Sequence, residues 1–294
     1  MVLNVLRSLR PRQWTKNLFV FAGLVFSEQK KLLDPRSAEL AVAAFAVFCV
    51  LSGVVYLVND IRDRDADRLH PTKSLRPIAS GALSVPAAAG AAVVLAVAGL
   101  GGAFWINQAF GVVGALYVSL LVLYSLSLKH IVILDALALA IGFVLRAIGG
   151  AVAIDVPFSH WLLLCTLLLA LFLAFSKRRA ELVTLAEGAT GHRRILAEYS
   201  PYLLDQMIGV VTASTLLAYA FYTISAETVA KFGTDHLLYT VPYPLYGIFR
   251  YLYLVHQREG GGNPSELLLT DRPLLACVAL WALTVIVILY GPWR

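Results

Sequence analysis

Four aspartates and one asparagine occur within nine residues, from Asn59 to Asp67, directly after a long apolar stretch. If a helix continues through this segment, Asp60, Asp63 and Asp67 fall within about 60° of one another, whereas Asp65 points away, because each residue turns a helix by about 100°. Like charges at these spacings repel one another. Carboxylate oxygens suit Mg²⁺, which usually shares its coordination between protein carboxylates and substrate phosphates. The three aspartates on one face are therefore predicted to bind Mg²⁺.

Basic residues follow the acidic segment closely. Lys73 and Arg76 lie within nine residues of Asp67. Carboxylates that hold a metal, next to cations that contact phosphate oxygens, form a site for a diphosphate. The alternative is a solvated loop whose acids are interleaved with arginines, but this alternative does not account for the cations that follow. The segment therefore predicts a metal-diphosphate site.

The elements that must position these residues are membrane spans. The chain is 59% hydrophobic and 14% charged, against roughly 45–50% and about 25% in soluble domains, which excludes a water-soluble globule. Apolar runs near the length of about 17 to 25 residues that a spanning helix needs predict nine spans in one all-α membrane domain, residues 1–294. The nine spans are Trp14–Ser27, Ser37–Leu57, Val85–Ile106, Phe110–Leu128, Ile131–Ile154, Trp161–Ser176, Met207–Ser225, Leu237–Val255 and Leu274–Tyr290.

The basic residues predict the orientation of these spans. With a cytoplasmic amino terminus, the loops 59–84, 177–206 and 256–273 share the cytoplasmic side and carry most of the Lys and Arg, as the positive-inside rule requires. We therefore expect a multi-pass protein of the plasma (inner) membrane whose active site faces the cytoplasm. The net charge of +6 is explained by the lysines and arginines in the loops of a membrane protein. The sequence has no basic stripe and no nucleic-acid-binding motif, which argues against nucleic acid as a partner.

The acidic motif at the end of the second span resembles the first aspartate-rich motif of the UbiA superfamily of intramembrane prenyltransferases. The resemblance extends to three further strings: Arg10-Pro11-Arg12-Gln13-Trp14-Thr15-Lys16-Asn17, Ala66-Asp67-Arg68-x-His70-Pro71-Thr72-Lys73-x-x-Arg76-Pro77-Ile78-Ala79, and Lys177-Arg178-x-Ala180-Glu181. It implies a bundle of nine transmembrane helices around a central, lipid-accessible cavity. Within the superfamily the strings resemble the branch that moves 5-phosphoribose from phosphoribosyl diphosphate to a polyprenyl, decaprenyl-type phosphate, which makes a precursor of a cell-envelope arabinose donor.

The sequence departs from the general superfamily pattern after the sixth span. Where the resemblance implies a second aspartate-rich motif, the chain has Lys177, Arg178, Arg179 and Glu181. A more anionic ligand is therefore expected, and phosphoribosyl diphosphate adds a 5-phosphate to its diphosphate. Glu181, four residues after Lys177 on one helix face, is open to three roles: orienting the lysine, holding a ribose hydroxyl or assisting the metal. The alternative is a positive-inside cluster that ends the span.

Three cations in apolar surroundings are further candidates. Arg146 stands in the middle of a predicted span, where an unpaired charge costs at least about 2.5–3.5 kcal/mol. It is expected either to face the cavity or to pair with Asp135, about three turns away. Lys129 either closes the phosphate site or is a boundary lysine whose charge reaches the membrane surface. Arg250 is a candidate for the acceptor phosphate.

The resemblance implies that the acceptor phosphate attacks C1 of the donor ribose while Mg²⁺-bound diphosphate leaves. The catalytic candidates are Asp60, Asp63, Asp67 and Lys177, the three aspartates being the Mg²⁺ ligands. The substrate-binding candidates are Lys16, Asn17, Asn59, Lys73, Arg76, Lys129, Arg146, Arg178, Glu181 and Arg250. The alternatives are transfer of a prenyl group from a prenyl diphosphate to an aromatic or other small acceptor, and a transporter for an anionic lipid or metabolite. Homo-oligomerisation is left open.

Overall fold

The computed structural model describes residues 1–186, 194–257 and 264–291, and within these ranges all the regular secondary structure is helical. They form two compact units. The first unit comprises residues 1–27, 31–158 and 194–195, and the second comprises residues 28–30, 159–186, 196–257 and 264–291. The prediction of one domain over the whole chain stays a prediction.

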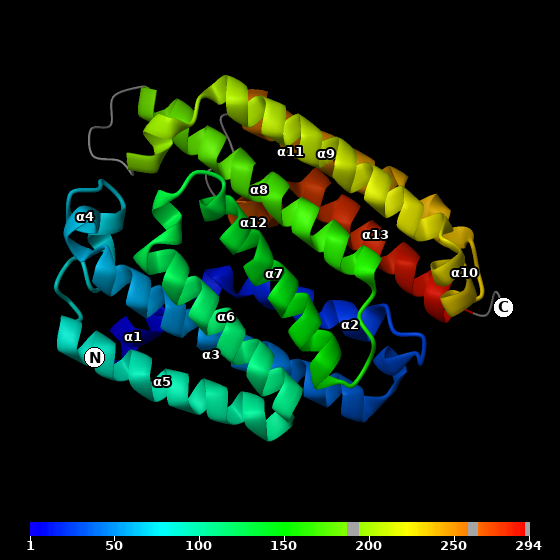
Figure 1. Cartoon of the computed structure of the whole chain (residues 1–294), viewed down its shortest axis with the longest axis horizontal. Coiled ribbons are helices and arrows are strands. Elements are labelled where there is room, and N and C mark those ends of the chain that lie inside the picture. Colours follow the sequence, from blue (N-terminus) through cyan, green and yellow to red (C-terminus); the bar gives the residue numbers. More distant parts are fainter. Residues whose placement is uncertain (187–193, 258–263, 292–294) are drawn as a thin grey trace. The chain divides into compact units, whose positions relative to one another are not determined.

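The first unit contains α-helices, labelled α (Figure 1), and short 3₁₀ helices, labelled η in the text. They are α1 (Val2–Ser8), η1 (Pro11–Phe21), α2 (Ala22–Val25), η2 (Lys31–Leu33), α3 (Pro35–Arg62), α4 (Arg64–Arg68), η3 (Lys73–Leu75), α5 (Val85–Ile106), α6 (Gln108–Leu126), η4 (Leu128–His130) and α7 (Leu134–Ala153). The remaining helices are α8 (His160–Ala186), η5 (Arg194–Glu198), α9 (Pro201–Ile224), α10 (Ala226–Phe232), η6 (His236–Thr240), α11 (Pro242–Gln257), α12 (Pro264–Thr270) and α13 (Arg272–Tyr290).

Side-chain caps begin several of the long helices. Asp34 accepts a hydrogen bond from the backbone N–H of Ser37, at 3.1 Å, before the proline that opens α3. Asn107 accepts from the N–H of Phe110 at 2.7 Å, and its amide donates to the Val152 carbonyl at 3.0 Å. Such caps satisfy N–H groups that have no partner inside the helix. The Asn107 cap also joins the start of α6 to the end of α7.

Seven of the described helices are long and apolar enough to cross a membrane: α3, α5, α6, α7, α8, α9 and α13. On α5, the side chains of Val93, Val94, Val97 and Trp105 are exposed, as expected of a helix whose outer face meets lipid rather than water. The chain is therefore an integral membrane protein with several transmembrane helices. Two of the nine predicted spans, the first and the eighth, fall on shorter elements.

The first predicted span, Trp14–Ser27, is not one α-helix. Its residues form η1 and then the four-residue α2, and both pack on α7. The packing brings backbones together: a Cβ on Gly150 would lie 1.8 Å from the Val20 carbonyl oxygen, and one on Gly23 would lie 2.8 Å from the Cα of Ala151. Glycines at these positions allow an approach that a longer side chain would prevent.

The predicted loops also contain helix. In the segment 59–84, α3 continues to Arg62 and α4 follows, and in 177–206, α8 runs to Ala186 and α9 begins at Pro201. The segment 256–273 contains α12, while residues 187–193 and 258–263 lie outside the described ranges. In α8 the helix continues past the end of the apolar run at Ser176. The residues that follow are Lys, Arg, Ala and Glu, which are strong helix formers and whose charges can pair at i,i+3 and i,i+4.

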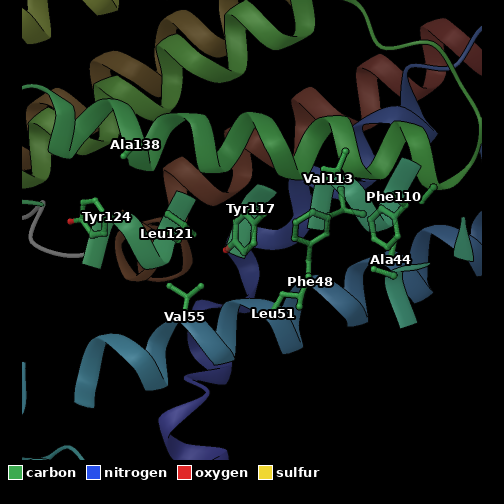
Figure 2. Close-up of a cluster of buried hydrophobic side chains, with 13 residues drawn as sticks. Ala44, Phe48, Leu51, Val55, Phe110, Val113, Tyr117, Leu121, Tyr124 and Ala138 are labelled. Carbon is green, nitrogen blue, oxygen red and sulfur yellow. The ribbon is translucent and has the colours of Figure 1, made fainter. Parts of the chain in front are cut away.

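The core of the first unit lies where α3, α6 and α7 meet. Figure 2 shows Phe48 and Leu51 of α3 pointing toward Phe110 and Tyr117 of α6. The Phe48 ring packs edge-on against both aromatic rings, with centroids 5.7 Å from Phe110 and 5.2 Å from Tyr117. Buried aromatic contacts of this kind contribute about 0.5–1.5 kcal/mol beyond their area. They fix the helix whose last turn carries Asp60.

We predict that Gly150→Ala destabilises the protein. The added methyl group would overlap the Val20 carbonyl, and overpacking of this kind costs about 1–3 kcal/mol. The apparent melting temperature of the purified protein should therefore fall by several degrees. The matched control is Gly90→Ala on α5, where nothing lies within 4 Å of the added Cβ. Equal melting temperatures for the two variants would contradict the close packing of η1 on α7.

Candidate active site

The acidic motif spans the junction between α3 and α4. α3 ends at Arg62 and α4 begins at Arg64, so the helix is not continuous as the face argument assumed. The hydrogen-bond pattern nonetheless crosses the junction, because the N–H of Asp63 donates to the Asn59 carbonyl at 2.9 Å and that of Asp67 donates to the Asp63 carbonyl at 2.8 Å. The i to i+4 hydrogen bonds therefore continue across the junction, although α3 and α4 are separate helices.

Asp60 and Asp67 are buried and share one arginine. Their side chains are 2% and 7% exposed. Nη1 of Arg76 donates to Oδ1 of Asp60 at 3.1 Å and to Oδ2 of Asp67 at 2.6 Å. Arg10 donates to the same oxygen of Asp60. Two carboxylates and two guanidinium groups thus neutralise one another, which is the condition under which charges remain buried.

The other two aspartates lie apart from this pair. Asp63 pairs with Lys129 of η4, whose side chain is buried. Asp65 is 83% exposed and contacts Arg64 at 3.1 Å and Arg68 at 3.7 Å. The expected outward direction of Asp65 is therefore seen, while the three predicted ligands divide into a pair and a single residue. Asn59 lies in the last turn of α3, directly before Asp60.

The backbone that carries Arg76 is anchored on both sides. Arg68 donates to the carbonyl of Ala79 at 3.0 Å, and the carbonyl of Pro77 accepts from the N–H of Leu83 at 2.8 Å. Ile78, Ala79 and Leu83 are buried. Gly81 turns the chain with a φ of 82°, a left-handed conformation that glycine adopts without strain. The Arg76 guanidinium is therefore presented to the aspartates from a fixed main chain.

Arg10 is a site residue that sequence reasoning did not select. It precedes Pro11 in a left-handed conformation, with φ 52° and ψ 65°, which costs a residue other than glycine about 1–3 kcal/mol. Its guanidinium lies 4.8 Å from the centre of the Tyr56 ring and contacts Asp60. The available signal was its position before a proline, where the α-helical region is disfavoured. The strained turn directs the arginine at the carboxylate.

Arg146 is held by neutral groups. Its side chain donates to Oδ1 of Asn17 at 2.7 Å and to the Tyr117 hydroxyl at 2.6 Å. The Ser52 hydroxyl lies 3.0 Å from that of Tyr117 and donates to Oδ1 of Asn17 at 3.2 Å. Among the described residues Arg146 makes no ion pair with Asp135, so that alternative for its charge is not observed. The network joins η1, α3, α6 and α7 through one buried guanidinium.

Two of the lysines predicted to contact phosphate, Lys16 and Lys73, also belong to the first unit. Lys16 lies in η1 next to Asn17, and Lys73 begins η3, three residues before Arg76. Both are partly exposed. Asn17, by contrast, is fully buried in the Arg146 network, and its side chain serves that network.

The candidates of the second unit form two groups. On α8, Arg178 donates to Glu181 at 2.9 Å, and Lys177 lies 3.8 Å from the other oxygen of Glu181. Glu181 thus contacts both cations, and the three roles predicted for it stay predictions. On α11, Arg250 donates to Asp271 through two nitrogens, at 3.2 and 2.8 Å. The Arg250 hydrogen bonds lower the pKa of Asp271, which also caps α13 by accepting from the N–H of Leu274.

Comparison with known proteins decides the family. The model of the UbiA prenyltransferase family matches residues 17–270. The chain belongs to this family. Decaprenyl-phosphate phosphoribosyltransferase of Corynebacterium glutamicum is 32% identical over 290 residues, covering 98% of this chain and 87% of that protein. The protein of the same name in Mycolicibacterium smegmatis is 33% identical over 297 residues, covering 97% and 92%. The resemblance read from the motifs is confirmed.

The fold of this UbiA family member also matches solved structures. A UbiA homolog from Archaeoglobus fulgidus, bound to GPP and Mg²⁺, superposes with a TM-score of 0.73 at 19% sequence identity, covering 97% of this chain and 99% of that one. The predicted all-helical UbiA-type bundle is thereby confirmed, and family membership favours a transferase over a transporter.

The oxygen donors of this UbiA family member fit a divalent cation in part. Among residues 1–186, 194–257 and 264–291, no three His, Cys, Asp or Glu side chains are close enough to hold one ion together. Asp60 and Asp67, however, face a single guanidinium nitrogen, so two hard carboxylate ligands already share one positive group. Mg²⁺ usually takes one or two carboxylates and completes its shell with water and phosphate oxygens. The pair therefore fits Mg²⁺ delivered with a diphosphate.

We predict that Tyr117→Phe lowers stability although the ring is kept. Loss of the hydroxyl leaves an N–H of Arg146 without its acceptor in a buried site, which costs about 1–3 kcal/mol. A loss of 1 kcal/mol corresponds to roughly 2–4 °C in domains of 150–250 residues. The apparent melting temperature should fall accordingly, while the exposed Tyr202→Phe of α9 serves as a control. Equal values for both variants would show that the network contributes no stability.

We predict a pH-dependent effect for Asp271→Asn. Because the pKa of Asp271 is lowered in the folded protein, its charged form stabilises the fold above the unfolded pKa of about 3.9, and this stabilisation is lost as the pH falls through the folded pKa. The variant should melt below wild type at pH 7, and the gap should narrow below about pH 4. Asp235→Asn, at an exposed position, should show no such gap. A gap independent of pH would contradict the ion pair.

Proposed function

We propose that this UbiA-family transferase moves 5-phosphoribose from phosphoribosyl diphosphate to a polyprenyl, decaprenyl-type phosphate, with Mg²⁺ as cofactor. The observation that carries the proposal is the group Lys177, Arg178 and Glu181 on α8, in which two cations contact one carboxylate. A prenyl diphosphate held by a second metal would need carboxylates there. Two relatives of about one third identity that carry the name decaprenyl-phosphate phosphoribosyltransferase support the same choice.

In the proposed reaction an oxygen of the acceptor phosphate forms a bond to C1 of the donor ribose. The bond from C1 to the diphosphate breaks, and the diphosphate leaves with the electron pair, giving polyprenylphosphoryl-5-phosphoribose, a precursor of a cell-envelope arabinose donor. The acceptor phosphate is already anionic near neutral pH, so no strong general base is needed. Catalysis then rests on alignment and on neutralising the charge of the leaving group.

Each candidate residue has a part in this scheme. Asp60 and Asp67 would hold Mg²⁺, which when bound neutralises charge on the diphosphate. Asp63 would join them as a ligand once it leaves Lys129, its partner in the structure. The cations that would contact phosphates of donor or acceptor are Lys16, Lys73, Arg76, Lys129, Lys177, Arg178 and Arg250. Arg146 would orient η1, the helix that carries Lys16, through its buried hydrogen bond to Asn17.

The proposal includes the membrane arrangement that the sequence predicts. The chain would cross the plasma membrane nine times, with η1–α2 and η6–α11 as the two shorter crossings, the amino terminus in the cytoplasm and the phosphates handled on that side. The lipid-accessible cavity that the family resemblance implies would receive the prenyl chain of the acceptor.

A second candidate is transfer of a prenyl group from a prenyl diphosphate to a small acceptor. The observation that favours it is the shared fold with the Archaeoglobus fulgidus homolog, whose structure contains GPP and Mg²⁺. The two candidates differ in the donor they require, so one experiment separates them.

We predict phosphoribosyl-lipid as the product when the purified protein receives labelled phosphoribosyl diphosphate, polyprenyl phosphate and Mg²⁺. Asp60→Asn, Asp63→Asn and Asp67→Asn should each reduce turnover by about 10²-fold or more, the size of effect seen when a group that stabilises transition-state charge is lost. Asp65→Asn is the matched control, because Asp65 is exposed and contacts Arg64 and Arg68 of its own segment.

Two outcomes would overturn this proposal. Formation of a prenylated acceptor from a prenyl diphosphate, with no phosphoribosyl-lipid, would assign the second candidate instead. An equal loss of turnover in all four aspartate variants would remove the distinction between the buried aspartates and Asp65.

A further inference from the structure

Arg76 has a place in the site that binding of a donor phosphate does not by itself explain. We propose that Arg76 is an exchangeable counterion: it neutralises Asp60 and Asp67 in the free protein, releases both carboxylates to a divalent cation, and turns to the phosphates of the donor. The inference rests on the proposed function in one respect, the use of a diphosphate donor with a divalent cation.

The first argument is the position of one atom. Nη1 of Arg76 donates to oxygens of both Asp60 and Asp67, so it occupies the volume where a cation shared by these two carboxylates would lie. Of these two carboxylates Arg10 contacts that of Asp60, and Lys129 contacts the separate Asp63. Among the described residues Arg76 is thus the cation whose contacts a metal shared by Asp60 and Asp67 must replace.

The second argument is charge. Asp60, Asp63 and Asp67 are balanced by Arg10, Arg76 and Lys129, so the site is neutral as it stands. A divalent cation added to this balanced site would leave an excess of positive charge against buried groups, which is costly in apolar surroundings. If the guanidinium leaves the aspartates for a diphosphate, each charge again has a partner. Arginine suits this second role because its fork matches phosphate oxygens.

The third argument is mobility. The main chain around Arg76 is held by the buried Ile78, Ala79 and Leu83 and by the hydrogen bond from Arg68 to Ala79. The Arg76 side chain itself is 24% exposed, so one side of it is open to solvent or ligand. The exchange therefore requires rotation of a long side chain and no movement of the loop backbone.

We predict opposite effects of Arg76→Gln on metal binding and on donor binding. The first measurement is binding of Mn²⁺ alone, without donor, followed by the electron paramagnetic resonance of free Mn²⁺ over protein in lipid nanodiscs. Removing the competing guanidinium should tighten Mn²⁺ binding by about tenfold or more, since a unit charge in contact with both ligands is lost. In the presence of Mg²⁺, binding of labelled phosphoribosyl diphosphate should weaken by about tenfold, because a charge-assisted contact is lost.

The matched control is Arg62→Gln. Arg62 is exposed at the end of α3 and makes no ion pair or side-chain hydrogen bond within the part of the chain that the structure describes. It removes the same charge from the same segment, so its Mn²⁺ affinity should stay within about twofold of wild type. The double variant Arg76→Gln/Asp67→Asn should lose the gain, which would place the bound Mn²⁺ at the freed carboxylates.

Three results would overturn the inference. Mn²⁺ binding by Arg76→Gln that is no tighter than wild type would show that Arg76 does not compete with the metal. A gain of equal size in Arg62→Gln would reduce the effect to net charge. Unchanged donor affinity in Arg76→Gln would exclude transfer of the guanidinium to phosphate. If wild type binds only a prenyl diphosphate, the proposed function fails, while the Mn²⁺ measurement and a donor measurement repeated with that compound still test Arg76.

Discussion

Neutralisation of buried charge is the constraint on which the arrangement of the first unit depends. Asp60 and Asp67 are removed from solvent at the end of α3, and such carboxylates remain charged only where cations are brought to them. The cations of this pair come from two separate stretches, with Arg10 before η1 and Arg76 after η3, while Lys129 of η4 neutralises the neighbouring Asp63. The left-handed turn at Arg10 and the anchored loop around Arg76 are consistent with this requirement, since each holds a guanidinium against the carboxylates.

Arg146 satisfies the same constraint in a different way. Its guanidinium donates to the side-chain Oδ1 of Asn17 and to the Tyr117 hydroxyl, and the Tyr117 and Phe143 rings each lie 4.8 Å from it. Neutral dipoles and ring faces stabilise a guanidinium more weakly than a carboxylate does, so the positive charge of Arg146 is compensated only in part by these contacts. The contacts also tie η1 to three long helices. Arg10 and Lys16 stand on or beside η1, and their positions therefore depend on a residue more than a hundred positions away.

The sequence predicted the family and most of the long helices better than it predicted the contacts among the candidate site residues. Apolar runs are local features, and the acidic motif is legible because its spacing repeats a helical turn. The pairing of Asp63 with Lys129 and of Asp60 with Arg10 joins residues 66 and 50 positions apart, which no local pattern contains. The helix break at Asp63 separated one carboxylate from the other two. Hydropathy also placed the end of the sixth span before Lys177, although helix propensity carries α8 further.

The two charged regions of the chain differ in the kind of ligand they can hold. Carboxylates bind a diphosphate only through a metal, whereas lysine and arginine bind phosphate oxygens directly. Asp60 and Asp67 represent the first kind of region, and Lys177 and Arg178, both in contact with Glu181, represent the second. A prenyl diphosphate carries no phosphate beyond its diphosphate. If Asp60 and Asp67 hold that diphosphate through a metal, Lys177 and Arg178 are left without a phosphate to bind. In the proposed reaction the donor has a 5-phosphate and the acceptor has a phosphate of its own, which gives the cations of α8 a ligand.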